Sequence, residues 1–172
     1  MSEMPATTAW WSEDDRRYVL SVMEQFRPKT VLEFGPGSST LALIDGGATR
    51  IDACEDDPEW LAIYRERIAN RYPGIVNLVF YTWSDPLVIP ACDAKARYDL
   101  ALIDGPLAID KRIATIRYSL DRAARVLVPL EHPDWQTSPL FKSLTEMTAL
   151  RNRNIYIDEI GPPSFAFAMV TP

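Results

Sequence analysis

Apolar residues along the chain follow two spacings, one typical of amphipathic helices and one typical of buried strands. Stretches with apolar residues three and four positions apart begin at a capping residue or a proline and end near a glycine or a proline, so they predict helices. Short apolar runs between them predict strands. The expected helices cover residues 12–26, 38–44, 58–71, 110–124 and 138–150. The expected strands cover residues 30–34, 50–54, 75–82, 98–103, 125–130, 154–158 and 165–170.

Strand and helix alternate until the chain closes with two strands joined by a short connection. Strands separated by helices form parallel sheets, whereas two consecutive strands favour an antiparallel hairpin. We therefore expect an α/β fold: a doubly wound, mostly parallel, seven-stranded sheet with a C-terminal antiparallel hairpin and helices on both faces. The length of 172 residues predicts a single domain over 1–172, with 1–12 as a flexible N-terminal segment.

A glycine turn after the first expected strand is the clearest candidate for a ligand site. Gly35 and Gly37 allow the backbone to approach a ligand closely, and the helix behind them offers free N–H groups. Glu33, at the end of the strand, can accept hydrogen bonds or attract a cation. Glu55 ends the second strand, where a carboxylate can accept both hydroxyl protons of a ribose.

Two classes of ligand compete for this turn, a dinucleotide and a nucleoside joined to an amino acid. Dinucleotide sites usually have a third glycine, but Thr40 stands at that position. Glu33 would repel a pyrophosphate and attract an ammonium group. Charge therefore favours the nucleoside joined to an amino acid, and a nicotinamide-dependent oxidoreductase is the weaker alternative.

Three short motifs resemble those of the class I S-adenosylmethionine-dependent methyltransferases. Residues 33–40 (EFGPGSST) resemble motif I of that family, and residues 53–60 (ACEDDPEW) resemble its second-strand acidic motif. Residues 98–106 (YDLALIDGP) are similar to its fourth-strand motif, in the form seen in small O-methyltransferase-like members. The resemblance covers roughly residues 15–172. It implies a Rossmann-like domain that binds S-adenosylmethionine.

The resemblance also implies roles for individual residues. Glu33 and the glycine turn would hold the methionine portion, Glu55 the ribose, Asp85 the exocyclic amine of adenine, and Asp104 would lie beside the sulfonium and the substrate. The full set of implied cofactor contacts is Glu33, Gly35, Gly37, Ser38, Ser39, Glu55, Asp56, Trp83, Ser84, Asp85 and Asp104.

His132 is the only histidine, and it follows the strand expected at 125–130. An imidazole with a pKa near ~6.5 suits the removal of a proton from a hydroxyl acceptor. His132 and Asp104 are therefore the candidate catalytic residues. Glu131 and Asp134 could join Asp104 around a hard cation, but their spacing departs from that of the magnesium-dependent members, so no metal ligand is predicted and a divalent cation stays open.

The net charge of −6 is concentrated in the first 60 residues, which hold 12 acids and 5 bases. An acidic chain disfavours a nucleic-acid substrate, so we expect a small-molecule substrate. The sequence shows no membrane span and no signal peptide. Cys54 and Cys92 read as reduced core thiols of a cytoplasmic protein. The oligomeric state is left open.

The first hypothesis is thus a methyltransferase that acts on a small molecule, with oxygen as the acceptor atom. The alternative is a protein that binds S-adenosylmethionine but is catalytically silent and serves as a partner or regulatory subunit. Five basic residues are expected to lie on one solvated helical face: Lys111, Arg112, Arg117, Arg122 and Arg125.

Overall fold

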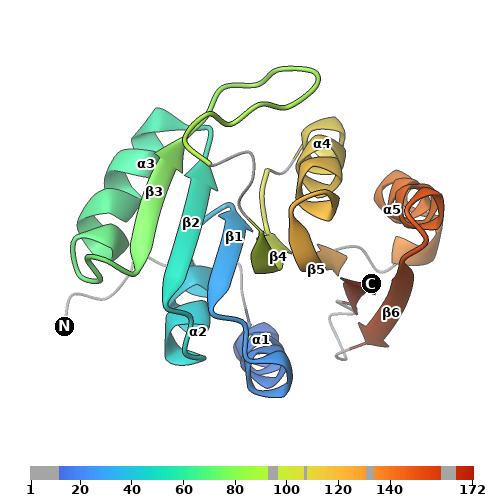
Figure 1. The fold of residues 1–172 in the computed structure, drawn as a ribbon, viewed down its shortest axis with the longest axis horizontal. Helices are drawn as coiled ribbons and strands as arrows, with labels where there is room; N and C mark the ends of the chain where they lie inside the picture. The colour runs from blue at the N-terminus through green and yellow to red at the C-terminus, as the bar shows by residue number, and fades with distance from the viewer. Residues whose placement is uncertain (1–11, 93–96, 107, 131–133, 160–165) are drawn as a thin grey trace.

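The computed structural model describes residues 12–92, 97–106, 108–130, 134–159 and 166–172. Their strands form one seven-stranded sheet with the order β3-β2-β1-β4-β5-β7-β6 (Figure 1). Neighbouring strands from β3 to β5 are parallel, whereas β7 is antiparallel to both β5 and β6. The strands are β1 (Thr30–Phe34), β2 (Arg50–Glu55), β3 (Val76–Phe80), β4 (Tyr98–Ile103), β5 (Ala123–Leu130), β6 (Asn154–Glu159) and β7 (Ala166–Thr171). The expected fold class is confirmed, including the closing hairpin.

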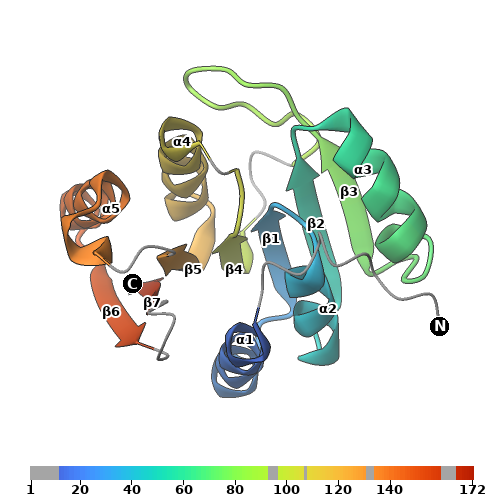
Figure 2. The same cartoon turned by 180° about the vertical axis from the view of Figure 1, so that it is seen from behind.

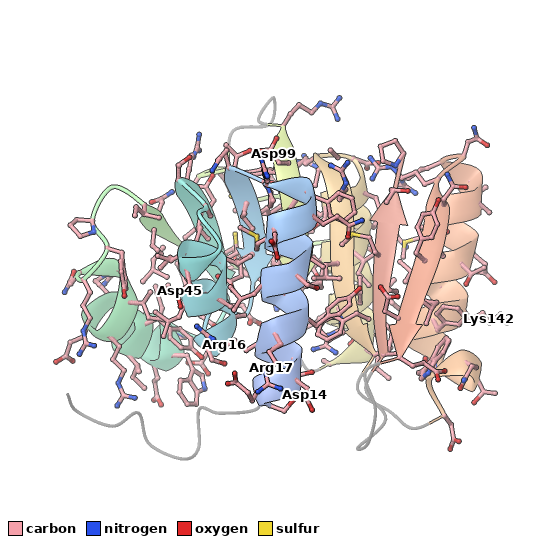
Figure 3. All side chains as sticks on the ribbon, turned by 90° about the horizontal axis from the view of Figure 1, so that it is seen from below. Asp14, Arg16, Arg17, Asp45, Asp99 and Lys142 are labelled. Atoms are coloured by element: carbon pink, nitrogen blue, oxygen red, sulfur yellow. The ribbon has the colours of Figure 1, made fainter. Side chains whose placement is uncertain are left out.

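Helices cover both faces of this sheet. One face carries α1, α2 and α3, and the other carries α4 and α5, so each face has its own hydrophobic core. Figure 2 shows the arrangement from behind, and Figure 3 shows α1 and α2 lying over the strands, with Arg16 of α1 reaching Asp45 of α2 at 2.8 Å. The helices are α1 (Glu13–Phe26), α2 (Ser38–Asp45), α3 (Pro58–Tyr64), α4 (Ile109–Leu120) and α5 (Pro139–Leu150), with a 3₁₀ turn at Trp135–Thr137.

Side chains along β1 alternate between the two cores, as the pleat of a strand requires. Leu32 and Phe34 enter the core beneath α4 and α5, whereas Val31 enters the core beneath α1 and α2. Glu33 follows the same alternation and lies on the α2 side, fully buried. A buried acid at this position must find polar partners within the fold, because an unpaired buried charge is costly.

The hairpin at the end of the chain is held by the first helix. Tyr18 of α1 donates a hydrogen bond to Asp158 of β6 at 2.6 Å and stacks on Phe167 of β7, with 4.6 Å between ring centroids. On the side away from β4, β5 pairs with β7, which follows β6 in the chain, and β6 pairs with β7 alone. The hairpin therefore joins the sheet through its second strand.

Three details differ from the sequence-based expectation. The helix expected over 58–71 is regular only to Tyr64, and Arg65–Ala69 form a π-helix in which the Asn70 N–H reaches the Arg65 carbonyl. Helix α4 ends at Leu120 instead of continuing to 124, because the run from Ala123 pairs as β5 with β4. The strand expected over 75–82 is limited to β3.

The prediction that the five basic residues share one solvated helical face is wrong. Arg112 is 5% exposed, and Arg125 lies on β5, where its guanidinium covers the ring of Phe26 at 4.4 Å. Arg122 covers the ring of Tyr118 at 3.7 Å. Guanidinium groups are attracted to the faces of aromatic rings and become partly buried there. Helical periodicity in the sequence does not show such contacts.

The carboxyl ends of β1, β2 and β3 point to the same edge, at the top of Figure 1, and the loop over residues 81–92 rises above them. Open α/β sheets bind ligands at this edge. No helix among the described residues is long and apolar enough to cross a membrane.

Candidate functional site

The glycine turn lies between the ends of β2 and β4. The Gly35 N–H donates to the Cys54 carbonyl at 3.1 Å, and the Phe34 carbonyl accepts from the Asp104 and Gly105 N–H groups at 3.0 and 2.8 Å. Gly35 has φ +80°, and a Cβ there would lie 2.6 Å from the backbone nitrogen of Gly105. Only glycine satisfies both conditions, since side chains are strained at positive φ and the neighbouring atom belongs to the backbone.

Glu33 supports this turn from below. Its two carboxylate oxygens accept hydrogen bonds from the hydroxyls of Ser39 and Thr40, at 2.6 and 2.7 Å, and Thr40 Oγ1 also accepts from the Gly37 N–H at 3.0 Å. Burial raises the pKa of Glu33 to about 8, although the two hydroxyl hydrogen bonds oppose the shift and the charge of Asp104 adds to it. The carboxyl group thus connects β1 to the first turn of α2 and carries a proton near neutral pH.

Glu55 lies at the end of β2 and is half-buried. Its Oε1 accepts from the N–H groups of Asp56 and Asp57, both at 3.0 Å. Among the described residues, none bonds its Oε2, so this oxygen can accept a ligand hydroxyl. Burial raises the pKa of Glu55 to about 6, the charges of Asp56 and Asp57 add to the shift, and the two backbone hydrogen bonds oppose it.

Asp56 joins two elements across the edge of the sheet. Its Oδ2 accepts a short hydrogen bond from the indole Nε1 of Trp83, which follows β3. The same oxygen forms an ion pair with the Nζ of Lys111 of α4, at 3.2 Å. Lys111 also lies over the Trp83 ring, 4.8 Å from its centroid. The structure therefore brings Asp56 and Trp83 together next to Glu55, with Lys111 as a third member that sequence reasoning placed in solvent.

Ser84 and Asp85 follow Trp83 in the loop after β3. The Ser84 hydroxyl donates to the Pro86 carbonyl and accepts from the Val88 N–H, so it stabilises its own loop. Asp85 is exposed and lines a cavity of about 480 Å³ between this loop and α4, together with Asp110 and Arg117. Both residues stay predictions as adenine contacts.

Asp104 follows β4 directly and is half-buried beside the turn. The backbone here is held by Arg112, whose Nε donates to the Pro106 carbonyl at 3.1 Å and whose Nη2 donates to the Asp104 carbonyl. A guanidinium offers several donors in a fixed plane, which suits two carbonyls of one turn. Arg112 is therefore the residue that fixes the orientation of the 104–106 segment.

Replacing Arg112 with methionine should lower the free energy of unfolding by about 2 to 4 kcal/mol, because the change leaves the half-buried carbonyls of Asp104 and Pro106 without these donors. Urea denaturation measures this loss. Arg117→Met is the matched control: it removes an exposed guanidinium from the same helix and should change stability by no more than about 0.5 kcal/mol. Equal stability of both variants would contradict the role given to Arg112.

Tyr64 of α3 is a site residue that sequence reasoning missed. Its hydroxyl oxygen lies 3.9 Å from the position that a Cβ on Gly37 would take. Two predicted contacts follow Gly37 at the start of α2: Ser38 is half-exposed, and Ser39 is buried and donates its hydroxyl hydrogen bond to Glu33. The apolar stripe of α3 predicts only that position 64 faces the protein. The position of the hydroxyl above the glycine turn depends on how α3 packs.

The proposed base, His132, lies outside the described residues, as does Glu131. Asp134 is described and precedes the 3₁₀ turn, which buries Trp135 against Phe141. Within the described ranges, no cluster of three or more His, Cys, Asp or Glu side chains is arranged to hold a metal ion. The catalytic pair and the divalent cation therefore stay predictions.

No family model and no curated protein matches this sequence. Solved structures do match it. An O-methyltransferase from Bacillus cereus in complex with S-adenosylhomocysteine is 14% identical, with a TM-score of 0.68 over 96% of this chain and 84% of that one. The SAH-bound methyltransferase PaMTH1 from Podospora anserina is 18% identical, with a TM-score of 0.66 over 98% and 82%. The O-methyltransferase TomG from Streptomyces achromogenes, in complex with SAM, is 15% identical, with a TM-score of 0.67 over 94% and 80%.

These comparisons define the class of fold: the chain has the Rossmann-like fold of the class I S-adenosylmethionine-dependent methyltransferases. The fold implied by the three sequence motifs is thereby confirmed. The likeness extends over nearly the whole chain and over most of each solved structure.

Proposed function

We propose that this protein is a single-domain, cytoplasmic methyltransferase that uses S-adenosylmethionine to methylate an oxygen atom of a small molecule. One observation carries the proposal: the ends of β1, β2 and β4 bring Glu33, Glu55 and Asp104 to the glycine turn. At Gly35 this turn has no space for a side chain, so its backbone is open to a ligand. The O-methyltransferases among the structural matches support the acceptor atom. The net charge of −6 supports a small molecule over a nucleic acid.

The residues present fit this cofactor. Glu55 has one oxygen without a partner among the described residues, which suits ribose hydroxyls, and a Cβ on Gly37 would meet only the Tyr64 hydroxyl within 4 Å among the described residues beyond its chain neighbours. The proximity of acids suits a ligand with positive charge, since opposite charges attract most strongly where water is partly excluded. Buried, unbridged Cys54 and Cys92, with sulfurs 3.8 Å apart, fit a reducing compartment.

Methyl transfer is an in-line displacement, for which the cofactor supplies an activated methyl group. The task of this chain is to orient donor and acceptor and to remove the hydroxyl proton. In this proposal Asp104 lies beside the sulfonium and the acceptor, held there through its backbone by Arg112. His132 takes the acceptor proton.

The first test is a thermal-shift titration with S-adenosylhomocysteine beside NADH, each with and without Mg²⁺. A ligand at a hundred times its dissociation constant stabilises the folded state by about 2.7 kcal/mol, which is several degrees for a domain of this size. We expect a shift with S-adenosylhomocysteine. A shift with NADH alone would favour the nicotinamide alternative. Binding without methyl transfer to any hydroxylated acceptor would favour the catalytically silent alternative.

Replacing Glu55 with glutamine should weaken S-adenosylhomocysteine binding at least about tenfold, because the amide accepts fewer hydroxyl protons than a carboxylate. Glutamine can still accept from the N–H groups of Asp56 and Asp57, so the fold should persist. Isothermal titration measures the affinity. Glu24→Gln removes the same charge from the exposed surface of α1 and should leave the affinity unchanged. Equal affinity of the Glu55 variant and wild type would overturn the ribose assignment.

A further inference from the structure

The hydroxyl end of Tyr64 lies beside the glycine turn. Its ring stacks on Trp60 of the same helix, with 5.8 Å between centroids and 22° between planes. Its hydroxyl oxygen lies 3.9 Å from the Cβ position of Gly37. Among the described residues the hydroxyl has no hydrogen-bond partner. A half-buried hydroxyl without a partner is unusual next to a ligand edge, because folded proteins pair most such groups.

The charges around this hydroxyl are mainly negative. Burial raises the pKa of Tyr64 most, and the carboxylates of Glu55, Glu33 and Asp104 raise it further, in that order. The guanidinium of Arg67 opposes them and has the smallest effect. The phenol therefore stays protonated and neutral at physiological pH. Glu55, the acid with the largest effect on Tyr64, has a pKa of about 6 and is ionised at neutral pH, so this place attracts a cation.

The roles proposed for these acids indicate which part of the ligand lies near Tyr64. In the proposed function Glu55 holds the ribose, whereas Glu33 and Asp104 lie on the side of the amino acid. The atom of S-adenosylmethionine that joins its ribose portion to its amino-acid portion is the sulfur. The Tyr64 hydroxyl lies 3.9 Å from the Cβ position of Gly37, and acids of both groups act on it, so a place near that sulfur suits it.

We propose that the hydroxyl oxygen of Tyr64 contacts the positively charged sulfonium of S-adenosylmethionine and makes the site prefer this cofactor over its uncharged product. The inference rests on the proposed function. A lone pair of a neutral hydroxyl attracts a sulfonium and the hydrogen atoms on its carbon substituents, but it has little attraction for a thioether. Tyr64 is thus a specificity-determining residue that favours release of S-adenosylhomocysteine after transfer.

Tyr64→Phe tests this directly, because phenylalanine keeps the ring on Trp60 and removes only the oxygen. We expect the dissociation constant of S-adenosylmethionine to rise about fivefold to tenfold, the loss typical of one contact to a charged group. The dissociation constant of S-adenosylhomocysteine should stay within about twofold. Isothermal titration without acceptor measures both. Tyr72→Phe, a second half-buried tyrosine after the π-helix, should change neither.

The other possible results distinguish a failure of this inference from a failure of the proposed function. An equal loss of affinity for both ligands would show that the hydroxyl binds the ribose or the amino-acid portion, and unchanged affinity for both would show that it binds nothing; either result overturns the inference while the proposed function stands. Wild-type protein that binds neither ligand would overturn the proposed function and this inference together.

Discussion

Gly35→Ala should destabilise the protein by about 3 kcal/mol or more and abolish binding of S-adenosylhomocysteine. Alanine at φ +80° costs roughly 1 to 2 kcal/mol by itself, and its methyl group would lie 2.6 Å from the Gly105 nitrogen and 2.8 Å from the Gly105 Cα. Relief of this contact would separate the ends of β1 and β4, where Phe34 accepts two hydrogen bonds. Urea denaturation and titration calorimetry measure the two effects.

Gly37→Ala is the matched control in the same turn. Gly37 has φ 177°, which alanine also adopts, and a Cβ there meets only the Tyr64 hydroxyl at 3.9 Å. Its stability should stay within about 1 kcal/mol of wild type. Ligand affinity should nevertheless fall, since the methyl group takes the space above the turn. Normal stability of Gly35→Ala, or full affinity of Gly37→Ala, would contradict this account of the two glycines.

The second large effect is the pH dependence caused by Glu33. Its pKa is about 8 in the folded protein and near the ordinary value of 4.5 when the chain unfolds, so between these values the folded state binds more protons. The free energy of unfolding therefore falls as pH rises from about 4.5 through 8, by on the order of 3 to 5 kcal/mol. Glu33→Gln resembles the protonated carboxyl group and should lack this decrease, so its stability relative to wild type should increase with pH.

Binding should respond to the same proton. A cationic ligand favours the charged form of Glu33, so wild-type affinity for S-adenosylmethionine should increase between pH 6 and 9, with part of the increase below pH 7 from Glu55, whose pKa is about 6. In Glu33→Gln only the Glu55 part should remain. Denaturation and titration series over this range measure both dependences. Parallel pH curves for the two proteins would show that Glu33 does not titrate here.

The elements of the fold were predictable because burial imposes local patterns on the sequence. Thr30–Phe34, the glycine turn and the Ser38 helix start are adjacent in the chain, so their roles appear together in a short string. The partners of Glu33 are also local, since Ser39 and Thr40 follow it by six and seven residues and lie in the first turn of α2.

The remaining features depend on contacts between segments far apart in sequence. The ion pair from Lys111 to Asp56, which lie 55 residues apart, exists only once α4 packs beside the sheet edge. Arg112 bonds carbonyls only six and eight residues before it, but the helical pattern does not show that its side chain turns back to them. A basic residue on a helix has the same sequence signal whether it is solvated or buried against carbonyls. The placement of Tyr64 depends likewise on the packing of α3, and no local pattern reports it.

The insertion of β7 between β5 and β6 has a consequence for how the chain folds during synthesis. A ribosome delivers β6 before β7, yet β6 has no place in the sheet until β7 pairs with β5. Until then Tyr18 also lacks both of its hairpin contacts, one of them 140 residues away. Contacts this distant in sequence form slowly. The nascent protein therefore exposes the edge of β5 until β7 emerges, and during this interval a chaperone would protect that edge.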